Sequence, residues 1–507
     1  MQSNSVSRRN TVVRDGAITL AVYAPFGTDV ALTNYPDGVR KDARSHPLTL
    51  NLLKVVESGV NVSLLIDLFD DETYRVDIPA RNPAGLEVTA LGKLAMEQGA
   101  TLASHVSHAA SFAAGASLVL ALEGHGAGFL PDLDTRLMTF DNATGEGLYE
   151  WRLGSGVSNV FNVDDGEGVV QQGAPVLPVT NPTSPTNHLA VSTWDLGDAL
   201  RQGRDGANDL IAVLHFNNCF NMSVEVLHTV APYAEFATGY CNYNFFSAGE
   251  AYPLVFEHLA RSGSVTSETL AKWFAAANHA VLLKAGHEPT VAGTVDLARM
   301  HDIVEKVDDL SDALLAALRT ASPTERPVVV GNIKQAIVNA QQYDSRPDYI
   351  LETPDELTDL DSFAASLLNF DFAPYKVAAA ADALRSALAG IKQYGDDDSP
   401  WMDPAVKWDF SSPNLAMNIF LPDPLMKGLW DWRSQYYLDV NPDPRKPQVQ
   451  KHVIEFLKVT DWVDFLIEYH RDTPFVGLLP ALIPEIPILH TKIDPRCPGK
   501  TLDGNVR

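Results

Sequence analysis

The chain has 507 residues and a formal net charge of -26, with 64 acidic and 38 basic residues. Hydrophobic residues make up 46% and charged residues 20%, which is typical of a globular protein with one large domain or two ordinary ones. The acidic excess and the lack of a Lys/Arg run argue against a nucleic-acid partner. No apolar run approaches the roughly 20 residues that span a bilayer, so no membrane partner is expected.

The cysteines are few and scattered. Cys219, Cys241 and Cys497 do not form a disulfide framework or a paired-cysteine zinc motif. Arg8-Arg9 superficially resembles a twin-arginine export signal, but charged residues follow and no small-residue cleavage site appears. The expected compartment is the cytoplasm, where a free thiol stays reduced.

Strand-length apolar runs alternate with stretches of helical spacing in the first half of the chain. The expected strands are Ile18–Tyr23, Val60–Ile66, Ala116–Leu122 and Leu210–Phe216. The expected helices between them include Leu48–Glu57, Ala90–Ala113 and Ser223–Val230. This alternation predicts an α/β fold in which helices cover both faces of a mostly parallel sheet. Because such sheets bind ligands at the carboxyl ends of their strands, we expect the chemistry directly after these runs.

The remainder of the chain predicts further segments. A loop-rich insertion is expected at about 130–185, because Gly, Asp, Asn and Pro are frequent there. Later helices are expected at 297–318 and 375–391, then a strand at 414–421 and a final helix containing Trp462 and Phe465. The expected organisation is a disordered lead-in at 1–17, a catalytic domain at 18–260, a mainly helical C-terminal portion at 261–475 packed on it, and a tail at 476–507.

Two strand ends carry reactive side chains. The third run ends before His125, which has Gly124 and Gly126 as neighbours, so the backbone there is free of bulk. The fourth ends before Cys219, close to a helix start that would favour a thiolate. On neighbouring parallel strands, His125 and Cys219 would share one rim, as nucleophilic catalysis requires. Backbone N–H groups of Gly126 and Cys219 would stabilise an oxyanion, with about 3 kcal/mol per donor. A single Cys or His, taken alone, is more often a core residue.

The motifs around these residues resemble those of a known family. Residues 124–128 resemble the HGxG motif after the third strand of clostripain-like peptidases, and residues 216–226 resemble their FDACLMGxxEV segment. The similarity extends over roughly Ile18 to Arg471, through Leu20–Ala24, Val62–Asp67, Tyr233–Phe236, Leu415–Phe420 and Thr460–Leu466. The resemblance to clostripain-related cysteine peptidases of the caspase clan implies a caspase-like α/β/α sandwich with a His125–Cys219 dyad.

One departure from the family pattern concerns specificity. The family residue two positions before the catalytic Cys is usually an Asp in the pocket for the substrate side chain preceding the scissile bond, and here it is Asn217. Since an amide supplies no negative charge for Arg or Lys, we expect a weaker preference for these side chains unless Glu250 or Glu225 supplies it.

Other features of the family have counterparts of lower specificity. Relatives are often matured by cleavage between the catalytic His and Cys; the insertion contains the candidate processing sites Arg136 and Arg152, although flexible acidic loops offer cleavable sites in any case. Some relatives need calcium, for which residues 396–398, all Asp, would offer oxygen ligands, but they lack EF-hand spacing and a solvated turn explains them better. His105 and His108 lack the accompanying acid of a helical metal motif, so no metal site is expected.

The sequence therefore predicts a cysteine endopeptidase that acts on a protein or peptide through an acyl-enzyme. A regulatory role in a bacterial proteolytic cascade, with a regulatory protein partner and activation by a cut in the insertion, is one version of this function. The alternative is a catalytically weak pseudopeptidase that binds peptides or partners, for which Asn217 and Asn218 are the main support.

Overall fold

The computed structural model describes most of the chain. The described residues are 10–27, 30–68, 72–126, 128–133, 191–204, 209–286, 290–343, 357–395, 410, 412–415, 417–421, 437–438, 440 and 450–470. Within these ranges, no helix has the length and apolar character needed to cross a bilayer.

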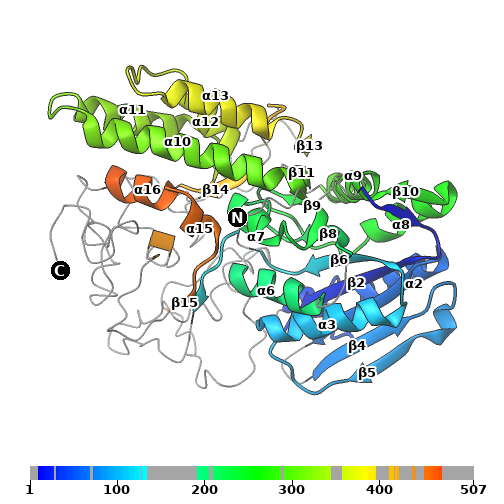
Figure 1. Ribbon diagram of the computed structural model, residues 1–507. Helices are drawn as coiled ribbons and strands as arrows, with labels where there is room; N and C mark the ends of the chain where they lie inside the picture. The colour runs from blue at the N-terminus through cyan, green and yellow to red at the C-terminus, as the bar shows by residue number, and fades with distance from the viewer. Residues whose placement is uncertain are drawn as a thin grey trace, which may run out of the picture.

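A nine-stranded sheet forms the centre of the fold (Figure 1). Its strands, in spatial order, are β13 (Lys392–Gly395), β11 (Val291–Asp296), β9 (Ala234–Tyr240), β8 (Ile211–Asn217), β6 (Ser117–Glu123), β2 (Ile18–Pro25), β3 (Asn61–Leu68), β4 (Glu72–Ile78) and β5 (Glu87–Ala90). The five strands from β9 to β3 are parallel, and antiparallel strands extend the sheet on both sides. This confirms the predicted α/β class and shows that the sheet is mixed.

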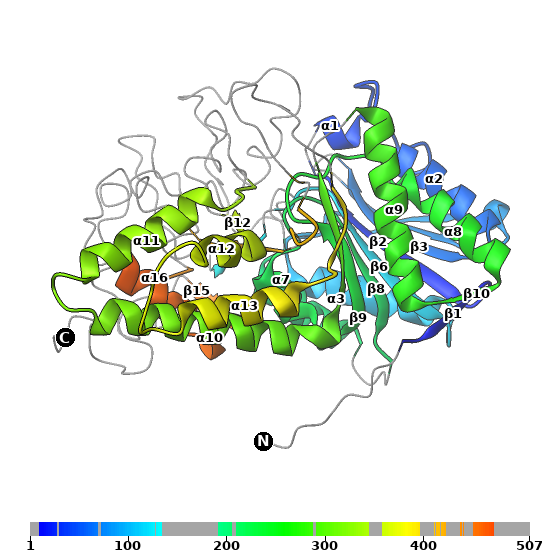
Figure 2. The same ribbon diagram turned by 90° about the horizontal axis from the view of Figure 1, so that it is seen from above.

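Helices cover both faces of this sheet (Figure 2). One face carries α2 (Pro47–Glu57), α8 (Ala251–Ser262) and α9 (Ser267–Ala285), and the other carries α3 (Gly99–Phe112), α6 (Thr193–Gly203) and α7 (Val224–Val230). Strand β6 illustrates why two cores form, because successive side chains point to opposite faces. Leu118, Leu120 and Leu122 enter one core, whereas Val119 and Ala121 enter the other.

The C-terminal part is mainly helical and lies beside the sheet (Figures 1 and 2). Its helices are α10 (Met300–Thr320), α11 (Arg326–Asn339), α12 (Leu360–Leu367), α13 (Val377–Leu388), α15 (Phe456–Val459) and α16 (Trp462–His470). Two small antiparallel pairs accompany them, β12 (Leu357–Asp359) with β14 (Asn418–Phe420) and β7 (Asp132–Leu133) with β15 (Gln450–His452). The short elements α1 (Val30–Thr33), η1 (Pro83–Gly85) and η5 (Leu297–Arg299) complete the described fold.

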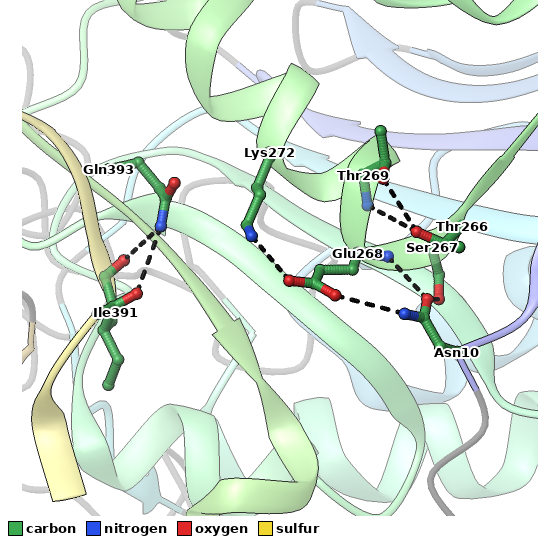
Figure 3. A network of polar contacts seen from close by, with 9 residues as sticks. Asn10, Thr266, Ser267, Glu268, Thr269, Lys272, Ile391 and Gln393 are labelled. Carbon is green, nitrogen blue, oxygen red and sulfur yellow. Dashed lines mark hydrogen bonds and ion pairs between the residues drawn. The ribbon is translucent and has the colours of Figure 1, made fainter. Parts of the chain in front are cut away.

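The expected disordered lead-in contains a strand, which corrects that prediction for residues 12–14. Strand β1 (Val12–Arg14) pairs antiparallel with β10 (Ser264–Thr266). The buried carboxylate of Glu235 accepts hydrogen bonds from the Thr11 N–H at 3.0 Å and from the Ser267 hydroxyl at 2.6 Å. Asn10 bonds Glu268 and Ser267 at the start of α9 (Figure 3). These contacts hold a segment whose sequence alone carries no strong strand signal.

The predicted strands and helices agree with the structure more closely than the predicted domain limit does. The four predicted strands match β2, β3, β6 and β8 to within two residues at each end. The helix expected at 90–113 begins only at Gly99, because residues 87–90 pair with β4 instead. The central sheet also continues past residue 260, the predicted end of the catalytic domain, because β11 and β13 belong to it. The helical portion is therefore joined to the catalytic sheet through shared strands.

Candidate active site

The ends of β6 and β8 lie side by side at the centre of the sheet (Figures 1 and 2). Their parallel register pairs Leu122 with Phe216 and Glu123 with Asn217. His125 and Cys219 each follow this last pair by two residues, just beyond the carboxyl ends of the two strands. His125 is partly buried, and Cys219 keeps 8% of its surface exposed. The two predicted catalytic residues thus follow paired strand ends.

Gly126 lies very close to the main chain of Cys219. A Cβ atom added there would lie 2.2 Å from the Cys219 carbonyl oxygen and 3.0 Å from the Asn218 side chain. Real Cβ atoms essentially never come so close to backbone, so only glycine permits this approach of the two strand ends. The contact is an independent sign that the segment after His125 lies against the segment containing Cys219.

The Cys219 sulfur is held by one main-chain segment. Its thiol donates to the Asn244 carbonyl oxygen at 3.2 Å, and the Asn244 N–H donates to the sulfur at 3.3 Å. A thiolate would lose the first of these bonds and keep the second. The N–H of Asn244 therefore favours the charged form of the sulfur, whereas the Asn244 carbonyl oxygen favours the neutral thiol.

Phe220, the residue after Cys219, has an unusual backbone conformation. Phe220 has φ of 60°, a left-handed value that is uncommon for a residue with a bulky side chain. It is held there by its N–H bond to the Asn242 carbonyl oxygen and by burial of its ring, which is 2% exposed. The Asn418 side chain of β14 also donates to the carbonyl oxygens of Phe220 and Cys241, both at 2.8 Å. Strand β14 thus holds the turn that contains Cys219 and Phe220 in place.

A buried polar network lies directly beneath the strand tips. The Asn217 amide nitrogen donates to both Glu123 carboxylate oxygens, at 3.1 and 3.0 Å, and the Tyr252 hydroxyl donates to the same carboxylate. The Asn217 amide oxygen accepts from the Asn244 side chain at 3.0 Å. Asn278 in turn donates to the Asn244 side-chain oxygen at 3.3 Å. The network connects the end of β6 to the residue that contacts the thiol.

The electrostatics of this network centre on Glu123. Burial raises the pKa of Glu123 to about 7, against the lowering effect of its bonds with Tyr252 and Asn217. Burial also raises the pKa of Tyr252 well above its usual value, and the nearby Glu123 charge adds to the effect. The carboxyl group of Glu123 is therefore expected to change its charge near neutral pH, close to the proposed dyad.

The other predicted site residues occupy different surroundings. Asn217 is 4% exposed and bonded within the network, whereas Glu250 is exposed at the start of α8. Glu225 is fully buried, and it accepts from the Phe420 N–H at 3.0 Å and from a tyrosine hydroxyl at 2.9 Å. Arg136, Arg152 and residues 396–398 lie outside the described residues.

Neither the second cysteine nor the helical histidines form a site with these residues. Cys241 is free and fully buried, and burial raises its thiol pKa well above the usual value. His105 is buried, and its pKa is lowered to about 3, chiefly by burial, while His108 bonds Asp77 at 2.9 Å. In the ranges described above, no group of three or more His, Cys, Asp or Glu side chains could hold a metal ion.

Glu123, Asn244 and Tyr252 were not predicted from the sequence as site residues. A signal for Glu123 exists in the sequence, because a charged residue at the end of a buried central strand needs a partner. Asn244 and Tyr252 carry no such signal, since their positions depend on how the loop after β9 folds back over β8.

The fold and the strand tips together define the class. The molecule is an α/β protein with a nine-stranded, mostly parallel central sheet, a helical C-terminal part, and a His and a Cys at adjoining strand ends. Comparison with solved structures places it beside clostripain-family cysteine proteases. A secreted C11 cysteine protease from Bacteroides thetaiotaomicron, iotapain, matches 84% of this chain and 97% of its own, with a TM-score of 0.51 and 11% identity.

Two further solved structures match over a similar share of the chain. The same kind of secreted Bacteroides thetaiotaomicron protease, in complex with an irreversible peptide inhibitor, covers 80% of this chain and 92% of its own, with 13% identity and a TM-score of 0.48. An inactive zymogen C11 protease from Parabacteroides distasonis covers 83% and 98%, with 12% identity and a TM-score of 0.47. No family model matches the sequence, and no curated protein matches it either. At these identities the similarity establishes the fold, and it confirms the predicted resemblance at that level.

Proposed function

We propose that the protein is a cysteine endopeptidase in which Cys219 is the nucleophile and His125 its catalytic partner. The observation that carries the proposal is the β6–β8 register, which pairs Glu123 with Asn217, two residues before His125 and Cys219. The close approach of Gly126 to the Cys219 carbonyl and the fold shared with cysteine proteases support it further.

The proposed reaction uses only groups at these two strand ends. His125 takes the Cys219 proton, and the sulfur attacks the peptide carbonyl carbon. The N–H groups of Gly126 and Cys219 stabilise the resulting oxyanion. The C–N bond then breaks as His125 returns its proton to the leaving amine. Water, deprotonated by His125, attacks the thioester and releases the acid product and the thiol.

Substrate preference is proposed to depend on the surroundings of Asn217. Its amide oxygen is already occupied by Asn244 and its amide nitrogen by Glu123. An exposed acid such as Glu250 would be screened by solvent and would attract a basic side chain weakly. We therefore expect a weaker preference for Arg and Lys than a carboxylate inside the substrate pocket would give.

Activation by cleavage between His125 and Cys219 remains part of the proposal. The two segments that flank residues 134–190 are bonded to each other, because Leu130 and Thr193 exchange two hydrogen bonds. Strand β7 also pairs with β15, and Asp132 bonds His452 at 2.6 Å. A cut at Arg136 or Arg152 would therefore leave the two flanking segments bonded to each other, and a regulatory partner that triggers the cut would act without separating them.

The experiment is a mixed peptide library followed by mass spectrometry. The wild-type protein should cleave peptides, whereas Cys219→Ala and His125→Ala should not. Cys241→Ala is the matched control, because it removes a second buried thiol, which follows β9 and not β6 or β8. Cleavage that persists in Cys219→Ala would remove this residue from the mechanism. A chelator added to the same assay tests calcium dependence.

The alternative is a pseudopeptidase that binds peptides without cleaving them. The specific observation in its favour is the 8% exposure of Cys219, whose thiol is bonded to the Asn244 carbonyl. Under this alternative the wild-type protein would leave the library intact but retain a subset of its peptides, equally well with Cys219→Ala.

A further inference from the structure

A directed chain of side-chain hydrogen bonds runs from the end of β6 to the residue that holds the thiol. Glu123 has a carboxylate that accepts from Tyr252 and Asn217. Asn217 accepts from Asn244, which accepts from Asn278. Every bond therefore points toward Glu123. An amide side chain can face either way, so the carboxylate end sets the direction for the whole chain.

The chain ends at the sulfur. The main chain of Asn244 makes two hydrogen bonds with Cys219, and the Asn244 side chain bonds Asn217. All of these groups are at least nine-tenths buried, Glu123 being 2% exposed and Asn244 8%. A buried network of this kind fixes geometry because water cannot replace a lost partner.

We propose that Glu123 is a positioning residue for Cys219, acting through Asn217 and Asn244. The inference rests on the proposed peptidase function for its kinetic consequence, but its structural part concerns only the reactivity of the sulfur. The carboxylate holds the Asn217 amide with its nitrogen toward β6, and this leaves the amide oxygen free to anchor Asn244. The anchored main chain then presents its N–H to the sulfur.

Replacement of Glu123 by Gln should disturb this order without removing volume. Asn217 places its nitrogen within 3.1 Å of both oxygens of Glu123, so the Gln amide group would set one donor against another. The two donors either remain opposed at the contact between residues 123 and 217, or the Asn217 amide turns over and loses its hydrogen bond from Asn244. In both cases the segment that contacts the thiol loses its fixed position.

A swap of the carboxylate to the other strand should restore the order. In Glu123→Gln with Asn217→Asp, Gln at 123 can accept from Tyr252 and donate to the new carboxylate at 217. That carboxylate can still accept from Asn244, so the Asn244 amide keeps its direction. Asn217→Asp alone should be harmful, because it faces two carboxyl groups across a contact of about 3 Å.

The test measures the alkylation rate of Cys219 by iodoacetamide in a background of Cys241→Ala with Cys497→Ala, so that Cys219 is the one thiol left. Peptide cleavage is measured in parallel, as kcat and KM. Each single variant should lower the alkylation rate and kcat by about tenfold or more, Glu123→Gln should change KM little, and the swap should recover most of both rates. Unchanged rates in Glu123→Gln, or a swap no better than the worse single variant, would overturn the proposal.

Glu235→Gln is the matched control for general damage. Glu235 is also buried, at 6% exposure, but its hydrogen bonds go to Thr11 and Ser267 and hold β1. It should lower the unfolding temperature and leave Cys219 alkylation unchanged. If the wild-type protein cleaves no peptide, the proposed function fails, while the alkylation series still decides the role of Glu123.

Discussion

Two buried glutamates, Glu123 at the end of β6 and Glu225 in α7, have hydrogen-bond partners in different parts of the molecule. Glu225 is 0% exposed and accepts from the Ser223 hydroxyl, the Phe420 N–H and the Tyr437 hydroxyl. Two of these partners come from segments about two hundred residues away in the sequence. Glu225 therefore clamps the C-terminal part onto α7.

Glu123 is buried to a similar degree, but its partners lead elsewhere. Its bond to Asn217 continues through Asn244 to the Cys219 sulfur. Burial raises the pKa of both carboxyls, and hydrogen bonds oppose the shift in both. The comparison teaches that the chemistry of a buried acid does not decide its role. What decides it is the group at the far end of its hydrogen bonds.

The largest effect is expected from Gly126→Ala, which disrupts the strand-tip region and leaves α7 intact. The new Cβ would lie 2.2 Å from the Cys219 carbonyl oxygen, so the two strand ends must separate. A misplacement of about 1 Å can lower activity about 100-fold. We expect at least this loss in kcat/KM, measured on a cleaved peptide from the library.

Gly331→Ala is the matched control for this substitution. Gly331 lies in α11, and an added Cβ there meets nothing within 4 Å. Because Ala is a better helix former than Gly, this variant should be more stable by about 0.5 to 1 kcal/mol and equally active. Equal activity of the two variants would show that the strand tips tolerate separation.

The sequence predicted the centre of the fold better than its periphery. The runs around Leu120 and Leu214 are continuous and apolar, as expected for strands covered on both faces, and they became β6 and β8. Strands β4, β5, β11 and β13 were missed, because outer strands are short or carry polar residues and depend on a neighbour for pairing.

The same distinction applies to the candidate site. His125 and Cys219 could be predicted because each directly follows a predictable strand, and neighbouring parallel strands end at one rim. Asn244 could not, because it lies in a loop and reaches the sulfur only through the fold of that loop. The roles assigned to these residues stay predictions until they are tested.

The pH dependence of stability should separate Glu123 from other titrating groups. Its pKa is about 7 in the folded protein and near 4.5 when unfolded. Between these values the folded state keeps a proton that the unfolded state has lost, so stability falls as pH rises. The loss should approach about 3 kcal/mol above pH 7.

Urea unfolding of the wild-type protein and Glu123→Gln, at pH 5 and pH 8, measures this effect. The other groups titrate alike in both proteins and cancel in the difference. The wild-type protein should lose more stability than the variant between the two pH values. Parallel losses would mean that Glu123 does not carry the raised pKa.

Glu225→Gln should weaken the clamp between α7 and the C-terminal part. The Gln amide nitrogen can only donate, so one of the Phe420 N–H, the Ser223 hydroxyl and the Tyr437 hydroxyl loses its acceptor. A buried polar group left in this way costs about 1 to 3 kcal/mol. Urea unfolding should show this loss, while the alkylation rate of Cys219 in the folded protein stays near the wild-type value. A variant with slow alkylation and full stability would reverse the roles assigned to the two glutamates.

The smallest effect is expected for an exposed glutamate that makes the same kind of contacts. Glu268 bonds Lys272 at 2.7 Å and Asn10 at 3.3 Å, with 43% of its side chain exposed (Figure 3). Because water replaces these partners and screens the charge, Glu268→Gln should change the free energy of unfolding by less than about 0.5 kcal/mol. Urea unfolding beside Glu225→Gln measures the difference directly. A loss as large as that of Glu225→Gln would mean that burial is not what makes the two buried glutamates matter, and that anchoring of β1 contributes more to stability than its exposed contacts suggest.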